Sequence, residues 1–267
     1  MKKHFHKMIF WNAHYVFLLK LLFAMLCIAF AIMLDDVQGV KYALTEGFTS
    51  VYYCFFNSVV FSGMFGTYVC AIICVIPYAS SYLKERNSGI FRYIAYRTGI
   101  LQYTLSKFVA GSITSGLCLS MGYGTFIMIL STKTSFVNSQ DILSGLHQFP
   151  YVSISLSGRE LNHIILILYY GFLTGSLWGG VTVFASAYIC DPLSLAVTPF
   201  ICKFLIVQIY RIARIPEIYR LDFWLYMGEV LISPKFTAIV SFLSIGFILT
   251  IFFICFKKRV ERSVRYE

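Results

Sequence analysis

Long apolar runs alternate with short polar segments along the chain. Six of the runs approach the ~20 residues that an α-helix needs to cross roughly 30 Å of hydrocarbon. They are too long and too continuous for the alternating strands of a membrane β-barrel. The pattern therefore predicts membrane-spanning helices at Tyr15 to Leu34, Val59 to Ala79, Phe108 to Leu130, Ile164 to Ile189, Leu193 to Tyr210 and Phe236 to Phe256.

The first run could also be a secretory signal, because Lys2, Lys3 and Lys7 precede it. A signal core is shorter than this run, and the Ala-x-Ala pattern that ends at Ala31 lies inside the run rather than after it. We therefore expect a first helix that is retained in the mature protein.

Composition supports a membrane protein. The 267 residues are 58% hydrophobic and only 13% charged, with a mean hydropathy of +0.75. Soluble domains are about 45–50% apolar and about 25% charged. A soluble fold could not hide this much apolar surface, so lipid must cover part of it. Six spans with short loops use the whole chain, so residues 1–267 form one all-α, polytopic membrane domain.

The distribution of charge predicts the orientation. The net charge of +10 would also suit a nucleic-acid binder, but the bases sit in short segments that flank the apolar runs. With the N-terminus inside, the inner segments hold 13 bases and four acids, and the outer segments hold seven bases and eight acids. The positive-inside rule then places both termini in the cytoplasm of a multi-pass protein of the cell membrane.

Two loops are unusual. The inner segment 80–107 is polar and basic. The outer segment 211–235 is rich in Ile, Leu and Tyr and contains Trp224, so it is too apolar for a free loop and too charged to cross the membrane. We expect short helices there, lying in or dipping into the outer leaflet.

The inner segment contains a short amphipathic stretch. Ser88-Gly89 is a helix break, and the residues after it alternate aromatic, aliphatic and basic side chains. At helical spacing one face carries Phe91, Ile94 and Ala95, and another carries Arg92 and Tyr96. Such a helix either binds acidic lipid at the membrane surface or presents a docking face to a cytoplasmic partner.

This segment resembles the permease of type-2 ATP-binding-cassette (ABC) transporters. In that family a segment with a Glu and a small-Gly step follows the second span, and a basic residue and a Gly/Ser-Lys pair lead into the third. The matching residues here are Glu85, Ser88-Gly89, Arg97 and Ser106-Lys107. The resemblance extends over the whole chain through the six spans and the inside termini. One departure is Tyr96, where the family often has Pro.

The resemblance implies a coupling helix that docks into a groove of a separate ATPase subunit. No Gly-x-x-x-x-Gly-Lys-[Ser/Thr] loop occurs in the chain, so the ATPase must be another polypeptide, and the chain itself needs no cofactor. Large aromatic side chains would anchor the contact, and arginines could pair with acids of the ATPase. The candidate coupling residues are Glu85, Ser88, Gly89, Phe91, Arg92, Tyr93, Tyr96 and Arg97.

Stripes of small residues predict close helix contacts. Gly171, Gly175 and Gly179 recur every four residues in the fourth run, and Gly116, Ser120 and Gly124 recur in the third. Such stripes let helix backbones approach closely in lipid, although they could also line a substrate groove.

Lys203 lies near the middle of the fifth run. A charge at mid-membrane costs about 3 kcal/mol, so it faces protein or water by default. It could contact an anionic group of a substrate, pair with an acid, or snorkel to the membrane surface, and it is the candidate for a substrate pathway. Lys20, near the inner end of the first run, is expected to snorkel.

Enzymatic and metal sites find little support. The eight cysteines lie mostly inside apolar runs, unlike a secreted disulfide framework. Cys70 and Cys74 lie one helical turn apart, but no other soft ligand is near them in sequence, so two core residues are favoured over a metal pair. His4-x-His6 is a weak metal pattern in a basic N-terminus. We see no paired carboxylates within a span and no catalytic triad.

The sequence thus favours a transport subunit that is not itself an enzyme. We expect the permease of an ATP-driven exporter, working as a dimer with a second copy or a homologue and moving a small amphiphile such as a peptide, an antibiotic or a lipid-like molecule. The alternative is a multi-pass protein that does not transport, such as an immunity or sensor protein.

Overall fold

The computed structural model describes residues 19–45, 49–61, 64–137, 151, 154, 159–227, 231 and 233–266. Within these ranges every regular element is a helix, which confirms the all-α prediction. The elements are α2 (Lys20–Asp35), α3 (Val37–Thr45), α4 (Val51–Phe56), η1 (Asn57–Phe61), η2 (Phe65–Val69), α5 (Cys70–Asn87), α6 (Ile90–Thr98), α7 (Ile100–Ser131), α10 (Glu160–Ala185), α11 (Pro192–Ile212), η4 (Glu217–Tyr219), α12 (Leu221–Leu225) and α13 (Pro234–Tyr266).

Four helices of the described chain, α7, α10, α11 and α13, are long and apolar enough to cross a membrane. The number rises to six when each of two bent helix pairs is counted as one span. This is the helix content of a multi-pass membrane protein. The N-terminal residues 1–18 and most of the segment from Ser131 to His163 lie outside the described residues.

The first predicted span is a short helix followed by a sharp turn. Helix α2 ends at Asp35, and α3 leaves it at an angle of 98°. The Asp36 carboxylate accepts a hydrogen bond of 2.9 Å from the backbone N–H of Gly39. This bond caps the first turn of α3, so the chain turns where its apolar run ends.

The second predicted span, Val59 to Ala79, is not one continuous α-helix. It consists of two π-helical segments, η1 and η2, and then α5, which continues to Asn87. The axis bends by 45° between Tyr78 and Ser80. Pro77 explains this bend, because it lacks an N–H and its ring displaces the preceding carbonyl.

The irregular start of this span is stabilised by a carboxylate from α2. Asp35 accepts hydrogen bonds from the backbone N–H groups of Phe65, at 3.0 Å, and of Gly66. A Cβ at Gly66 would collide with the carbonyl of Ser58. Only glycine therefore fits the close approach of the two π-helical segments.

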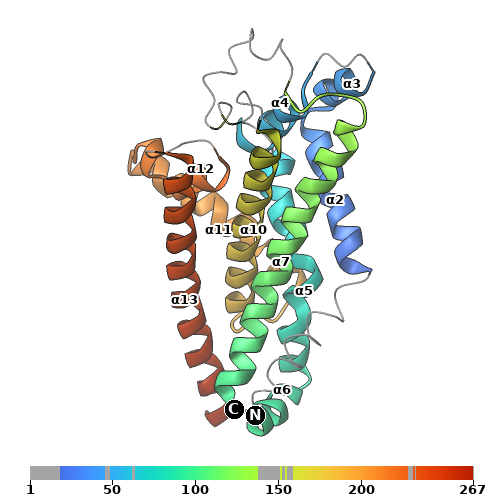
Figure 1. Cartoon of the computed structure of the whole chain (residues 1–267). Helices are drawn as coiled ribbons and strands as arrows, with labels where there is room; N and C mark the ends of the chain where they lie inside the picture. Colours follow the sequence, from blue (N-terminus) through green and yellow to red (C-terminus); the bar gives the residue numbers. More distant parts are fainter. Residues whose placement is uncertain are drawn as a thin grey trace.

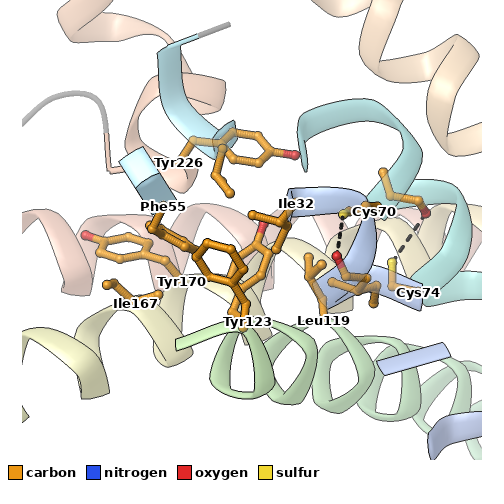
Figure 2. Close-up of a cluster of buried hydrophobic side chains, with 14 of the residues drawn as sticks. Ile32, Phe55, Cys70, Cys74, Leu119, Tyr123, Ile167, Tyr170 and Tyr226 are labelled. Atoms are coloured by element: carbon orange, nitrogen blue, oxygen red, sulfur yellow. Dashed lines mark hydrogen bonds between the residues drawn. The ribbon is translucent and has the colours of Figure 1, made fainter. Parts of the chain in front are cut away.

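Helix α7 runs through the centre of the bundle and contacts α2, α5, α10 and α13 (Figure 1). Large side chains from these helices and from α4 fill the interior (Figure 2). The Tyr123 ring of α7 meets the Phe55 ring of α4 edge to face, with centroids 5.1 Å apart. The buried thiols of Cys70 and Cys74 belong to the same interior and donate to the carbonyls of Ile28 and Ala71.

The glycine stripe of α10 lies at the contact between α7 and α10. A Cβ on Gly175 would lie 2.5 Å from the carbonyl oxygen of Ser115, and one on Gly179 would lie 2.6 Å from that of Gly111. A Cβ on Gly171 would meet the Tyr123 ring at 2.8 Å. The stripe therefore lets two backbones touch. It does not line an open groove.

The two ends of the bundle differ. At one end, α6 lies beside the last turns of α13 (Figure 1). At the other end, η4 and α12 follow α11, and the indole Nε1 of Trp224 donates to the carbonyl of Ile218 at 2.7 Å. The segment predicted to lie in the outer leaflet thus contains two short helices. Its position relative to a membrane stays a prediction.

A substitution tests the close contact. Gly175→Leu should lower the melting temperature and the yield of folded protein, because overpacking a tight contact costs about 1–3 kcal/mol. Gly246→Leu is the matched control in α13, where nothing outside its own helix lies within 4 Å of an added Cβ. Thermal unfolding followed by size-exclusion chromatography measures both variants. Equal melting temperatures would contradict the assignment.

Candidate functional site

Two glycines with left-handed backbones separate helix α6 from α5 before it and from α7 after it in the sequence. Gly89 has a φ of 73° at the start of α6, and Gly99 has a φ of 87° at its end. Residues with a side chain rarely adopt these backbone conformations, so glycine is required at both breaks. The Ser88 hydroxyl donates to the carbonyl of Glu85 at 3.1 Å, which completes the end of α5. The predicted Ser88-Gly89 break is therefore a defined corner.

One face of α6 packs against the bundle. Phe91 and Ala95 are buried there, and the Phe91 ring meets the Tyr82 ring edge to face at 6.2 Å. Tyr82 in turn packs against Phe256 of α13, with centroids 5.1 Å apart. Phe91 was expected among the partner-facing anchors, but it is only 2% exposed. It holds α6 to α5 and α13.

The opposite face of α6 is a row of exposed side chains. Tyr93 and Tyr96 are 81% and 75% exposed, and Ile90 and Arg97 lie beside them at helical spacing. Arg92 is half-buried, with its guanidinium 5.7 Å from the Phe91 ring centroid. Of the candidate coupling residues, Ser88, Tyr93, Tyr96 and Arg97 are exposed, so a partner could reach them.

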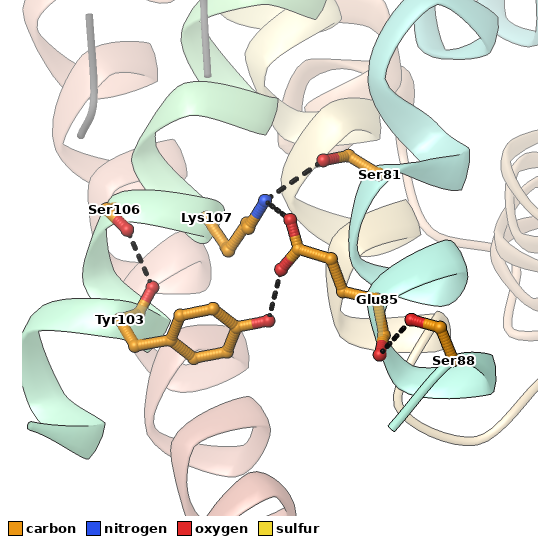
Figure 3. A network of polar contacts seen from close by, with 6 residues as sticks. All are labelled: Ser81, Glu85, Ser88, Tyr103, Ser106 and Lys107. Carbon is orange, nitrogen blue, oxygen red and sulfur yellow. Dashed lines mark hydrogen bonds and ion pairs between the residues drawn. The ribbon is translucent and has the colours of Figure 1, made fainter. Parts of the chain in front are cut away.

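A polar network joins the two helices that flank α6 (Figure 3). Lys107 Nζ of α7 lies 2.5 Å from Glu85 Oε1 of α5 and donates to Ser81 Oγ at 3.1 Å. The Tyr103 hydroxyl donates to the other carboxylate oxygen of Glu85 at 2.7 Å. The structure thus brings together Glu85 and Lys107, which are 22 positions apart in sequence. Ser106 bonds within its own helix, to the carbonyl of Tyr103.

Breaking the network costs much folding free energy because its lysine is buried. The Lys107 side chain is 2% exposed, whereas that of Glu85 is 24% exposed. A buried charge needs an opposite charge and hydrogen bonds to offset its lost hydration. Lys107 obtains both from α5, so this end of α5 and the start of α7 are fixed to each other. We name Ser81, Glu85, Tyr103 and Lys107 the elbow clamp.

Ser81 and Tyr103 were not among the predicted site residues, although their spacing in the sequence contained a signal. Ser81 lies four residues before Glu85, and Tyr103 lies four before Lys107, so each shares a helix face with its charged partner. Arg86 was also missed. Its guanidinium donates to the carbonyl of Ser186 at 3.1 Å, just past the end of α10, and so ties that helix to the same corner.

A second polar feature lies deep in the bundle. Lys203 of α11 is 5% exposed, and its Nζ donates to the carbonyl of Thr67 in η2 at 2.9 Å. The ammonium also lies 3.8 Å from the ring centroid of Tyr226 and 4.8 Å from that of Tyr68. The ammonium is therefore enclosed by protein groups from η2 and from the segment that follows α12. Lys203 makes no ion pair with any acid in the described part of the chain.

Comparison of the chain with protein-family models, with curated proteins and with solved structures finds no match. Any function proposed for the chain must therefore be inferred from the geometry of α6, of the elbow clamp and of the Lys203 site.

Removing the acid of the elbow clamp should destabilise the fold strongly. Glu85→Gln leaves Lys107 buried without an opposite charge, which costs about 3–5 kcal/mol. The matched control is Glu261→Gln, which removes the acid of a half-exposed pair with Lys257 at 3.5 Å and should cost about 0–1 kcal/mol. Thermal unfolding of both variants measures the difference.

A double-mutant cycle separates the pair from its surroundings. Lys107→Met should cost less than Glu85→Gln, because Glu85 then keeps Tyr103 and meets water. The double variant Glu85→Gln/Lys107→Met should be more stable than the sum of the single effects predicts, by about 0.5–3 kcal/mol. Additive effects would show that the two side chains do not act as a pair.

Proposed function

We propose that the chain is the permease subunit of an ATP-driven ABC exporter, with no ATPase site of its own. The observation that carries the proposal is α6, a short helix with exposed aromatic side chains held between two long helices. The Phe91 contact packs α6 against α5 and the cluster that α13 shares, and the elbow clamp fixes α5 to α7. A displacement of α6 by a partner would therefore move the helices that cross the membrane.

The partner in this proposal is a cytoplasmic ATP-binding-cassette ATPase. Tyr93 and Tyr96 offer large contact areas on a rigid helix, which is the profile of interface anchors. Arg97, beside them, supplies a positive charge for an acidic rim. A lipid-bound helix would bury its aromatic side chains in hydrocarbon, whereas Tyr93 and Tyr96 lie on the face of α6 opposite the buried Phe91, at one end of the bundle (Figure 1).

The proposal also includes a topology, a substrate class and an assembly. The excess of bases at the α6 end supports a cytoplasmic location for α6 and for the C-terminus. The substrate is a small amphiphile that leaves the cell. The working unit is a dimer of this chain with a second copy or a homologue, in the cell membrane.

Cysteine labelling tests the topology. On a background with all eight cysteines replaced, Ser88→Cys should react with a membrane-impermeant maleimide only after the cells are opened. Tyr219 lies at the other end of the bundle, and its side chain is 68% exposed. Tyr219→Cys should therefore react in intact cells. The opposite pattern would invert the orientation and remove α6 from the compartment that contains ATP.

Paired tyrosine substitutions test the coupling. Tyr93→Ala/Tyr96→Ala should release the ATPase, because aromatic anchors contribute about 2 kcal/mol or more each. Tyr42→Ala/Tyr219→Ala removes two exposed tyrosines at the other end of the bundle and is the matched control. The tagged chain is purified from its native membranes, and co-purifying ATP hydrolysis is measured.

The readout separates coupling from folding. The Tyr93→Ala/Tyr96→Ala variant should keep the melting temperature of the wild type, since neither side chain is buried. Retention of the full ATPase activity by this variant would refute the coupling assignment. The absence of any co-purifying ATPase from the wild type would instead favour a protein that does not transport.

A further inference from the structure

The charge of Lys203 is stabilised inside the bundle without being neutralised. One of its three N–H donors reaches the carbonyl of Thr67, and the ammonium lies over the rings of Tyr226 and Tyr68. A carbonyl dipole and two π faces hold a cation in place but leave its net charge intact. Lys107, by contrast, has a carboxylate 2.5 Å away.

Lys203 lies in the wall of a cavity of about 230 Å³ between α10, α11, α12 and α13. The rest of this wall is mostly apolar and aromatic, with Trp178, Leu225 and Tyr226 among its members. One acid, Asp222, also lines the cavity, and Arg220 holds it in a two-point contact at 2.8 and 3.3 Å. The carboxylate is therefore paired with Arg220, and although its charge acts on the ammonium, it makes no ion pair with Lys203.

A second cavity of about 300 Å³ adjoins the first, since Val207 and Tyr210 line both. Its wall contains Arg211, Arg214 and Arg220 near the end of α11. The two walls together contain four bases and one acid. Arg211 and Arg214 make no ion pair with a described acid, so bases dominate the charge of the two walls and attract an anion.

We infer that these cavities form a binding site for an anionic amphiphile. The phosphate or carboxylate of the ligand binds the ammonium of Lys203, and its apolar body packs against the side chains of Trp178, Leu225 and Tyr226. The ammonium keeps N–H donors for such a ligand, and a charge-assisted bond in a site poor in water is strong. A mid-membrane lysine that makes no ion pair with a described acid then has a use that offsets its cost.

The inference rests on the proposed function only where it identifies the ligand with the exported substrate. Binding itself needs neither ATP nor the ATPase. Anion binding without transport would therefore refute the proposed function and support the binding site. Transport without anion binding would support the proposed function and refute the binding site.

Fluorescence of Trp178 provides the measurement. In the Trp11→Phe/Trp224→Phe variant Trp178 is the one remaining tryptophan of the chain, and it lines the cavity. The full-length protein in phosphatidylcholine nanodiscs is titrated with brominated alkyl chains of one length that end in a phosphate, an alcohol or a trimethylammonium group. Bromine quenches tryptophan on contact, so quenching reports occupation of the cavity.

The phosphate probe should quench Trp178 at a concentration about tenfold or more below that of the other two probes. Lys203→Met should abolish this preference, and Lys203→Arg should retain it. Lys133→Met, an exposed lysine at the end of α7, is the control and should change nothing. A tryptophan placed at the exposed position Ile239, with Trp178 replaced by Phe, reports quenching from bulk lipid and should show no preference.

Equal quenching by the three probes, or an unchanged preference in Lys203→Met, would overturn the inference. If Lys203→Met does not fold, Arg211→Gln/Arg214→Gln leaves Lys203 in place and should weaken the phosphate probe several-fold. An unchanged affinity there would overturn the inference equally. Competition with phosphatidylglycerol in the nanodisc then distinguishes the source of the anion. Displacement of the probe by phosphatidylglycerol identifies the ligand as a membrane lipid. Continued binding of the probe identifies it as a free amphiphile. Both outcomes require an anion at Lys203.

Discussion

The buried ion pair between Lys107 and Glu85 determines how the α6 end of the bundle is built. Lys107 is almost fully enclosed, so its charge requires a carboxylate, and the nearest chain segment that can supply one is the end of α5. Meeting this requirement brings α5 and α7 together and leaves the residues between them to form the corner. Gly89 and Gly99 provide the backbone turns, and α6 fits between them. This pair fixes the two helices that flank α6, and the buried Phe91 holds α6, with its exposed tyrosines, against them.

The two buried lysines show how a helix bundle can use the same charge in different ways. Lys107 is paired with an acid, and the result is a rigid junction. Lys203 is held by a carbonyl and two aromatic rings, and the result is a charge that a ligand can still neutralise. Its carbonyl partner belongs to the π-helical start of the second span, where the backbone departs from regular α-helix. Irregular backbone at membrane depth is tolerated where protein or a cavity surrounds it.

Much of this architecture could be predicted from the sequence, and the failures have physical causes. Apolar run length predicted the helices because lipid imposes that length, and the Ser88-Gly89 pair predicted the corner because few residues adopt its backbone. The break at η1 and η2 could not be predicted, since it depends on Asp35, a residue of another helix, satisfying backbone groups across space. The burial of Phe91 was missed for the same reason, because helical spacing identifies a face without saying what covers it. The family resemblance named Glu85 and Lys107 as separate motif residues, whereas their pairing and the contribution of Tyr103 required the fold.

The proposed coupling depends most on what touches the exposed face of α6 in the cell. A photo-crosslinking amino acid, p-benzoylphenylalanine, placed at Tyr93 measures this directly, because it forms a bond with whatever lies against that side chain in living cells. The account predicts one protein adduct, whose crosslinked polypeptide contains a Gly-x-x-x-x-Gly-Lys-[Ser/Thr] loop. Crosslinks to lipid alone, with no such polypeptide, would contradict it.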